Sequence, residues 1–119
     1  MVVNQRDVLL LSHSFDSDKP HPFIILSVNE ANEQEKTFVA VMITSSEKTR
    51  DDFSFELSNE MFLSPLSKDN SHVRMHLITS SFNNCIIQKI NTMKIYPFNQ
   101  LMRSIGDLIF NFDFIPLKS

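Results

Sequence analysis

The sequence has very little glycine and cysteine, and each shortage excludes a class of protein. Its 119 residues include one glycine and one cysteine. A single cysteine excludes an intrachain disulfide, and a small domain without one fits a reducing compartment. A single glycine excludes a glycine-rich phosphate loop, and with it nucleotide binding of that kind. Turns must therefore be built from asparagine, aspartate, serine and proline.

The sequence also lacks an apolar stretch of membrane-spanning length. Residues 1–7 carry no apolar run followed by a small-residue cleavage site, so we expect no signal peptide. The formal net charge of −3 argues against a general nucleic-acid binder. The charge is uneven, because residues 1–60 hold 5 basic and 11 acidic side chains whereas residues 61–119 hold 6 and 3. An anionic ligand should therefore prefer the second half.

Apolar residues make up 42% of the chain, which is enough for one core, and the length fits a single domain over residues 1–119. Valine, isoleucine and phenylalanine far outnumber alanine, which favours strands over helices. The polar connection at residues 29–36 has room for one helical turn. Apolar runs and alternating patterns predict strands at residues 7–14, 23–28, 37–44, 53–57, 71–79 and 86–90.

Near the C-terminus the apolar spacing changes to three and four residues, which predicts an amphipathic helix with Pro97 in its first turn. Gly106 inside this helix costs about 1 kcal/mol relative to alanine, so we expect close packing there. The fold class is therefore mostly β (α+β), a small SH3-like barrel with the helix packed outside it. The predicted apolar face comprises Phe98, Leu101, Met102, Ile105, Leu108, Ile109 and Phe112.

The strand at residues 72–77 carries the most conspicuous polar pattern. Alternation predicts that Val73, Met75 and Leu77 face the core. His72, Arg74 and His76 then share the other face as a cationic stripe, with arginine suited to phosphate and histidine to proton transfer. His72 is a candidate for substrate binding on this stripe. The alternative is that the stripe is only the solvated outer face of a strand.

Other polar candidates lie at strand ends. His21 stands between two prolines before a buried strand, and its alternative is an exposed loop histidine. Thr44 and Ser45 end another apolar strand, where a hydroxyl usually serves a turn. Cys85 has no nearby triad pattern and is expected to be a buried or half-buried thiol. No ligands at metal-like spacing accompany the histidines, so we expect no metal site.

Short motifs along the chain follow an order that is similar to a known family. The motifs are Arg6-Asp7 before a hydrophobic strand, His21-Pro22 before a strand that ends at Ser27, Asn32 five residues later, Ile43-Thr44-Ser45, and Val73-Arg74-Met75-His76-Leu77. In this order the chain resembles the PemK/MazF family of bacterial toxins over residues 6–109. Members of this family are ribosome-independent mRNA endonucleases of type II toxin–antitoxin systems.

The chain departs from the family pattern at three positions. Arg6 stands where the family has glycine, and His21 stands where it has an arginine that usually belongs to the active site. His76 stands at the family's acidic position, whereas Arg74 and Thr44 are retained. The predicted catalytic set is thus altered at two of its positions.

The resemblance implies a metal-independent endoribonuclease of single-stranded mRNA, in which the ribose 2′-hydroxyl attacks the neighbouring phosphate. It implies catalytic roles for Arg74 at the phosphate, for His21 and His76 in proton transfer, and for Thr44. Thr44 and Ser45 would hydrogen-bond the phosphate or a base edge. No cofactor is expected. The implied partners are single-stranded RNA, a cognate antitoxin protein and a second copy of the chain in a cytoplasmic homodimer.

Two other functions stay open. Loss of the family's arginine and acidic residue is also typical of a degenerate member that binds RNA or protein and cuts nothing. The family's fold also hosts gyrase-poisoning toxins, which would act through the terminal helix. Independently of function, residues 45–52 contain no apolar side chain, so we expect a loop that becomes ordered only with a partner.

Overall fold

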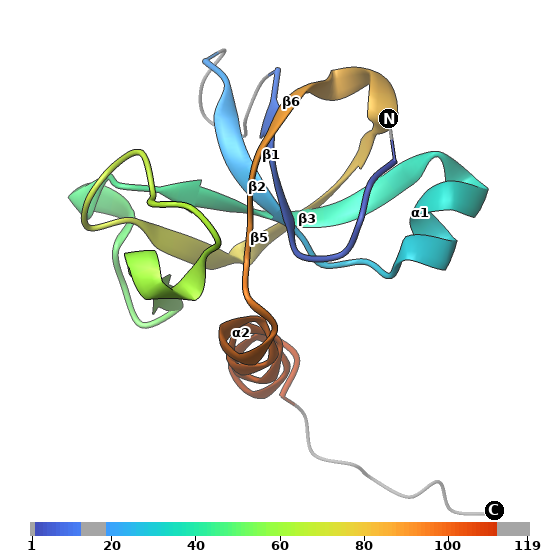
Figure 1. Ribbon diagram of the computed structural model, residues 1–119. Helices are drawn as coiled ribbons and strands as arrows, with labels where there is room; N and C mark the ends of the chain where they lie inside the picture. The colour runs from blue at the N-terminus through green and yellow to red at the C-terminus, as the bar shows by residue number, and fades with distance from the viewer. Residues whose placement is uncertain (1, 13–18, 112–119) are drawn as a thin grey trace, which may run out of the picture.

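A computed structural model describes residues 2–12 and 19–111, which form six strands, two α-helices and three short 3-10 turns (Figure 1). In chain order the strands and helices are β1 (Asp7–Leu11), β2 (His21–Ile25), α1 (Asn29–Glu35), β3 (Thr37–Thr44), β4 (Ser54–Glu56), β5 (His72–Phe82), β6 (Ile86–Thr92) and α2 (Ile95–Leu108). The three turns are η1 (Glu47–Thr49), η2 (Asn59–Met61) and η3 (Asn83–Cys85). The mostly β class and the C-terminal helix are therefore confirmed. Among the described residues no helix is both long enough and apolar enough to span a bilayer.

The strands form one antiparallel sheet in the order β4-β5-β3-β2-β1-β6. β4, which falls within the strand predicted at residues 53–57, lies at one edge. Beyond the two edges the chain meets itself, because Phe62 bridges Met93 and the Lys94 N–H donates to the Met61 carbonyl at 2.7 Å. The curled sheet with this closure matches the small barrel expected from the sequence.

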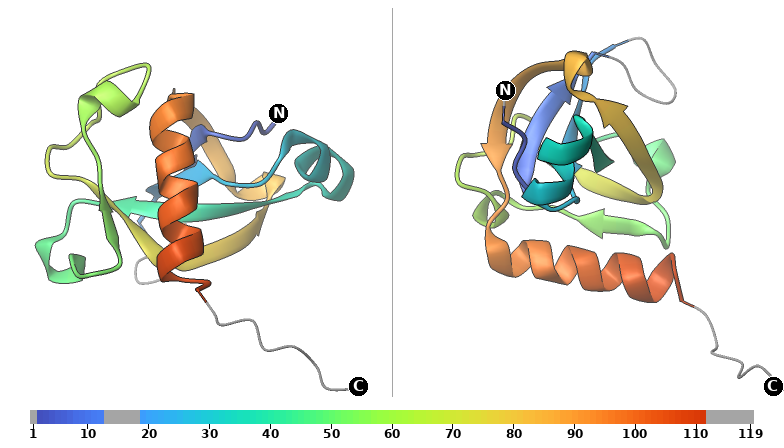
Figure 2. Two further views of the ribbon diagram at one scale, coloured as in Figure 1. Left: turned by 90° about the horizontal axis from the view of Figure 1, so that it is seen from below. Right: turned by 90° about the vertical axis from the view of Figure 1, so that its right-hand side faces the viewer.

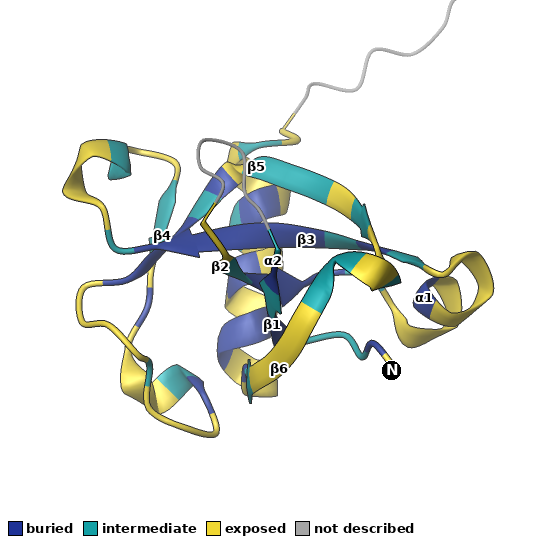
Figure 3. Ribbon diagram, turned by 90° about the horizontal axis from the view of Figure 1, so that it is seen from above, coloured by how far each residue is buried: buried dark blue, intermediate teal, exposed yellow. Residues whose placement is uncertain are grey.

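Apolar side chains form two clusters because alternate residues of a strand point to opposite faces. One cluster includes Val8, Ile24, Val41 and Ile43 and lies under α2. The other contains the intervening residues of β1, β2 and β3, such as Phe23. The third strand is therefore buried along most of its length, whereas β6 is largely exposed (Figure 3).

The helix α2 lies across one face of the sheet (Figure 2). Phe98, Leu101 and Ile105 are buried against that face as predicted. Gly106 does not pack closely, because a Cβ there would meet nothing within 4 Å. The expectation of a close approach at Gly106 is therefore wrong for the single chain. Phe112, at the end of the predicted face, lies outside the described residues.

The alternation predicted for β5 holds only in its first half. Val73 and Met75 are fully buried, but Leu77 lies outside both apolar clusters and the prediction that it faces the core is wrong. The reason is a register shift, because Ile43 pairs with Val73 whereas Val41, two residues away on β3, pairs with Ile78. The extra residues in β5 change which side chains face inward, so Ile78 packs against the core instead.

A pair of polar side chains, the buried Asn32 and the half-buried Ser27, joins β2, α1 and β3. Asn32 is 2% exposed and donates to the carbonyls of Val3 and Ser27 at 3.2 and 3.1 Å. The Ser27 hydroxyl donates to Asn32 Oδ1 and accepts from the Val39 N–H at 2.9 Å. The serine and asparagine whose spacing resembles the family pattern therefore have a structural role, because their hydrogen bonds hold these segments together.

Arg6, which stands where the resemblance places glycine, has a left-handed backbone with φ of 78°. An arginine in this region is strained by about 1–2 kcal/mol because its Cβ approaches the carbonyl oxygen. The strain is offset by contacts at both ends of the residue. The Arg6 N–H donates to Ile25 and its guanidinium donates to the Met93 carbonyl, both at 2.9 Å.

Candidate functional site

A cavity of about 360 Å³ lies where β2 begins and β3 ends. Apolar side chains such as Val8 and Ile43 line its inner wall, and the loop at residues 63–71 contributes much of the rest. Three of the residues predicted for the site line this cavity, namely His21, Thr44 and Ser45. The structure therefore brings together polar groups that are more than twenty residues apart in the sequence.

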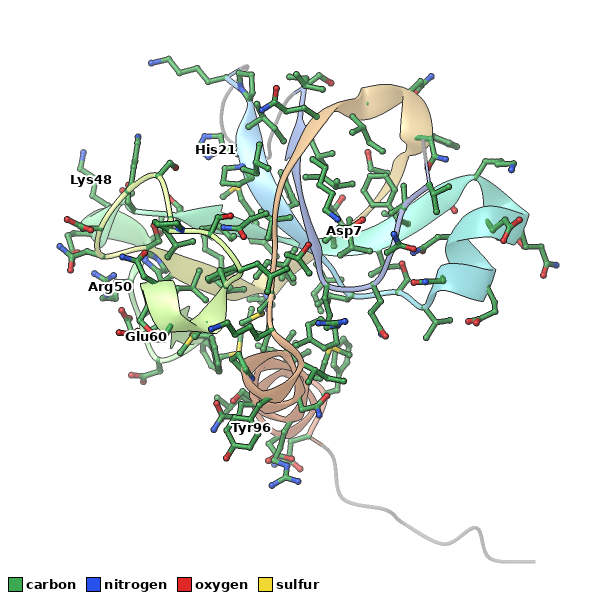
Figure 4. The ribbon with its side chains drawn as sticks, viewed as in Figure 1. Asp7, His21, Lys48, Arg50, Glu60 and Tyr96 are labelled. Atoms are coloured by element: carbon green, nitrogen blue, oxygen red, sulfur yellow. The ribbon has the colours of Figure 1, made fainter. Side chains whose placement is uncertain are left out.

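His21 and Thr44 meet because β2 and β3 are antiparallel. The register pairs Phe23 with Met42, so the first residue of β2 and the last residue of β3 lie at the same end of the sheet. Pro22 has no N–H to donate, and it pairs with Leu10 of β1, whereas the pairing of β2 with β3 begins only at Phe23. His21 is half-buried at the start of its strand (Figure 4).

The Thr44 hydroxyl has a turn role as well as a place in the cavity wall. Thr44 is 9% exposed, and its Oγ1 accepts a hydrogen bond from the Ser46 N–H at 3.2 Å. This contact confirms the turn interpretation made from the sequence. An accepting hydroxyl still has its own proton to donate, so Thr44 can also hydrogen-bond an anionic oxygen in the cavity.

The 63–71 loop is held in place at its start by two asparagine side chains. Asn91 Oδ1 accepts from the Ser64 N–H at 3.1 Å, and Asn91 Nδ2 donates to the Ser64 carbonyl at 2.9 Å. Asn59 Oδ1 accepts from the Leu66 N–H at 2.9 Å. These bonds satisfy the loop backbone where strand pairing is absent and fix this wall of the cavity.

Arg50 joins the end of the same loop to the loop at residues 45–52. Its guanidinium donates to the Asn70 carbonyl at 2.7 Å, to Glu56 at 2.9 Å and to Glu47. The hydrogen bonds to Glu47 and Glu56 raise the pKa of Arg50 above its ordinary value. Both loops that flank the end of β3 thus share one cation (Figure 4). The expectation that residues 45–52 order only with a partner stays a prediction, and these contacts were not anticipated.

His72 is fully buried, so the predicted surface stripe with Arg74 and His76 is wrong at this position. It lies opposite Thr44 in the pairing of β3 with β5, and its Nε2 is 3.0 Å from Thr49 Oγ1. Since the Thr49 hydroxyl donates to the Ser46 carbonyl, we assign the Nε2–H of His72 as the donor to Thr49. Its Nδ1 is then a buried acceptor that has no hydrogen-bond partner among the residues that the structure describes.

Burial is the main cause that lowers the pKa of His72, and the nearby Arg50 guanidinium lowers it further. The neutral imidazole is therefore favoured in the folded protein. His72 does not line the cavity, so its placement supports a structural contact to Thr49. Its predicted role in substrate binding stays untested.

Arg74 and His76 also lie outside the cavity wall. Arg74 is half-buried and pairs with Ser54 of β4, on the far side of β3 from β2. His76 is exposed in the stretch of β5 that the register shift displaces. In the single chain the four predicted catalytic residues are therefore not in one place. His21 and Thr44 line the cavity, whereas Arg74 and His76 of β5 do not.

Sequence reasoning missed two lysines of the cavity. Lys19 precedes β2 and Lys68 belongs to the 63–71 loop, and both line the cavity with His21. No aspartate or glutamate lines it among the described residues. For Lys68 the only signal was the positive balance of the second half of the chain, which does not identify individual lysines, and Lys19 lies in the acidic first half, where nothing indicated it.

Comparison with known proteins identifies relatives over nearly the whole chain. The sequence profile of a family described as PemK-like, MazF-like toxin of type II toxin–antitoxin system matches residues 5–109. No curated protein sequence matches the chain.

Solved structures of similar fold include enzymes. MazF from Deinococcus radiodurans superposes with a TM-score of 0.71 and 15% identity over 93% of this chain and 99% of that one. An endoribonuclease from a mycobacterial species gives 0.71 and 13% over 92% and 93%. A mycobacterial endoribonuclease in complex with its cognate antitoxin gives 0.69 and 14% over 92% and 94%. At these identities the likeness establishes the fold.

Proposed function

The chain belongs to the PemK-like, MazF-like family of toxins of type II toxin–antitoxin systems, and we propose that it cuts single-stranded mRNA at the cavity between β2 and β3. The observation that carries the proposal is the meeting of His21 and Thr44. Thr44 matches the family motif and His21 stands at the family's arginine position, and both line one cavity whose charged lining residues are all basic among those described. Structural relatives of the same fold are endoribonucleases.

The proposed reaction is an internal transesterification that needs no water as nucleophile. The O2′ of a ribose loses its proton to the imidazole of His21 as the O2′–P bond forms. The P–O5′ bond breaks, and the leaving O5′ takes a proton from the imidazolium or from water. The products are a 2′,3′-cyclic phosphate and a 5′-hydroxyl, so atoms and electrons balance.

The cavity supplies the other requirements of this chemistry from hydroxyl groups. Thr44 and Ser45 can donate hydrogen bonds to the phosphate oxygens, on which negative charge accumulates at the five-coordinate phosphorus. The apolar inner wall, which includes Val8 and Ile43, excludes water and strengthens these hydrogen bonds. Arg74 and His76 stay predicted catalytic residues from the resemblance alone.

The proposed partners are a cognate antitoxin and a second copy of the chain, acting in the cytoplasm. One structural relative is bound to its own antitoxin, which supports the first partner. Exposed apolar side chains on α2 support the second, because Tyr96, Met102 and Leu108 are 72%, 37% and 51% exposed. Light scattering should give twice the chain mass, and a monomer at high micromolar concentration would contradict the dimer.

The activity is tested by incubating the purified protein with a labelled single-stranded RNA and mapping the new ends. We expect fragments with 5′-hydroxyl and cyclic phosphate ends, and none from a matched DNA strand, which lacks the attacking 2′-hydroxyl. His21→Ala should reduce cleavage at least 100-fold, as removal of a general base typically does. Cleavage of the DNA strand would contradict the proposed attack by the 2′-hydroxyl.

A second candidate is a module that binds RNA and cuts nothing. The replacement of the family's arginine by His21 favours it, because the position loses a fixed positive charge. Binding of the RNA by the wild-type protein without any new ends would support this candidate over the nuclease.

A further inference from the structure

The cavity must supply positive charge from somewhere if an RNA backbone occupies it. His21 stands at the family's arginine position before the proline, and an imidazole, unlike a guanidinium, carries no permanent positive charge. Arg74, the cation predicted for phosphate contact, does not line the cavity. Neither residue therefore places a permanent cation in the cavity wall.

Lys68 meets this requirement from the 63–71 loop. Among the residues that the structure describes, its ammonium group has no hydrogen bond or ion pair. By contrast, Lys89 is paired with the buried carboxylate of Asp7 at 2.9 Å. An ammonium group without a partner at the wall of a cavity can accept an anionic ligand without first breaking an ion pair.

The backbone that carries Lys68 is fixed on its C-terminal side. The Ser71 hydroxyl donates to the Lys68 carbonyl at 2.9 Å, and the Leu57 N–H donates to the Ser71 carbonyl at 3.1 Å. Arg50 holds the intervening Asn70 carbonyl at 2.7 Å. The lysine side chain thus extends from a fixed backbone, so that binding a phosphate orders the side chain but costs little backbone entropy.

We propose that Lys68, assisted by Lys19 from the loop before β2, binds a backbone phosphate of the RNA and supplies the charge that the family's arginine would supply at position 21. This proposal rests on the proposed function. Lysine acts on phosphate as a compact point charge and makes no demand for two parallel hydrogen bonds. Two lysines from different loops therefore tolerate a phosphate that moves during the reaction.

The proposal is tested by RNA binding that is separated from cleavage. The probe is a fluorescent single-stranded RNA with 2′-O-methyl groups throughout, which cannot be cut by 2′-hydroxyl attack. Anisotropy titrations at several salt concentrations give the dissociation constant and its salt dependence. The variants are Lys68→Ala, Lys19→Ala, their double variant and Lys68→Arg, with Lys94→Ala as the control that removes an exposed lysine outside the cavity.

We expect Lys68→Ala to weaken binding several-fold at low salt and to lower the slope of log K against log salt concentration by about 0.7, the value for one phosphate contact on a single strand. The double variant should lower it by about twice as much, and Lys68→Arg should restore the wild-type slope. Lys94→Ala should bind as the wild type does.

The outcomes distinguish failure of the lysine assignment from failure of the proposed function. Wild-type binding with an unchanged slope in Lys68→Ala overturns the lysine assignment and leaves the nuclease intact. Equal losses in Lys68→Ala and Lys94→Ala also overturn it, because they indicate charge without a site. Failure of the wild-type protein to bind the RNA probe overturns both, whereas binding without cleavage of unmodified RNA overturns the nuclease and leaves the lysine contact in place.

Discussion

Nε2 of His72 lies 3.0 Å from Oγ1 of Thr49, and this contact joins β5 to the loop that leaves β3. The next residue in this loop is Arg50, whose guanidinium donates hydrogen bonds to Glu56 and to the carbonyl of Asn70. A neutral buried imidazole and a half-buried guanidinium thus anchor one segment. Their different chemistry gives separate predictions.

Stability should fall as the pH is lowered through the ordinary range of histidine. The folded-state pKa of His72 is below its unfolded value because of burial. Between these two pKa values the unfolded chain binds more protons than the folded protein, so the free energy of unfolding rises with pH. The stability that the neutral His72 contributes is therefore lost as the pH falls below about 6.5. The slope for one proton is at most about 1.4 kcal/mol per pH unit.

Urea unfolding at pH 7.5, 6.5 and 5.5 measures this slope, and His72→Gln should flatten it. His76→Gln changes an exposed histidine of the same strand and is the matched control. An identical pH dependence in wild type and His72→Gln would show that burial of His72 does not control acid stability.

Asn32→Ala should destabilise the protein by about 2–4 kcal/mol. The substitution leaves the Ser27 hydroxyl and the carbonyls of Ser27 and Val3 without their buried partner, and each unsatisfied group costs about 1–3 kcal/mol. Chemical denaturation gives the change, with the exposed Asn99→Ala on α2 as the control. A loss below 1 kcal/mol would mean that water replaces the asparagine.

Arg50→Ala should loosen both loops beside the cavity with little change in melting temperature. The two carboxylates that pair with Arg50 are exposed to solvent, since the Glu47 and Glu56 side chains are 69% and 62% exposed, so these ion pairs contribute little to overall stability. Hydrogen exchange should therefore rise at residues 47–50 and 68–71 and stay unchanged in the core of β3. Arg50→Lys retains the charge but cannot reach three partners, and should give most of the same effect. Unchanged exchange in both variants would assign the order of these loops to other contacts.

Arg74→Ala tests two different expectations: the family resemblance implies that Arg74 is catalytic, whereas the structure of the single chain places it outside the cavity. Because Arg74 does not line the cavity, we expect its RNA cleavage to fall less than that of His21→Ala, by no more than about tenfold. Initial rates on the same RNA give the comparison. A loss as complete as that of His21→Ala would restore the role of Arg74 at the phosphate.

Much of the fold follows from local patterns in the sequence. The third strand occupies the predicted residues 37–44, because a β-branched run bounded by polar residues has few alternatives. The register shift in β5 could not be predicted, since it depends on how β5 divides its pairing between β3 and β4. Leu77 was misplaced for this reason, whereas His72 pairs with Thr44 before the shift and is buried where the loop at residues 45–52 contacts it through Thr49.

The site was predictable where a motif and a strand end coincide. His21, Thr44 and Ser45 satisfied both conditions and do line one cavity. Lys68 lies in a loop without periodicity, and its position depends on side-chain hydrogen bonds from Arg50 and Ser71. Such hydrogen bonds join residues that are distant in the sequence or belong to no periodic pattern, so local sequence patterns do not predict them.

The pairing of β1 with β6 has a consequence for how the protein is made. Val8 belongs to the first strand and Asn91 to the last, yet both line the cavity, and Asn91 also holds the 63–71 loop. During translation the first strand must wait for about eighty residues before its outer partner leaves the ribosome. A chain cut short by a premature stop before β6 therefore has neither a closed sheet nor a formed cavity. Incomplete products of synthesis should therefore cut no RNA, and the proposed cleavage begins only with the finished chain.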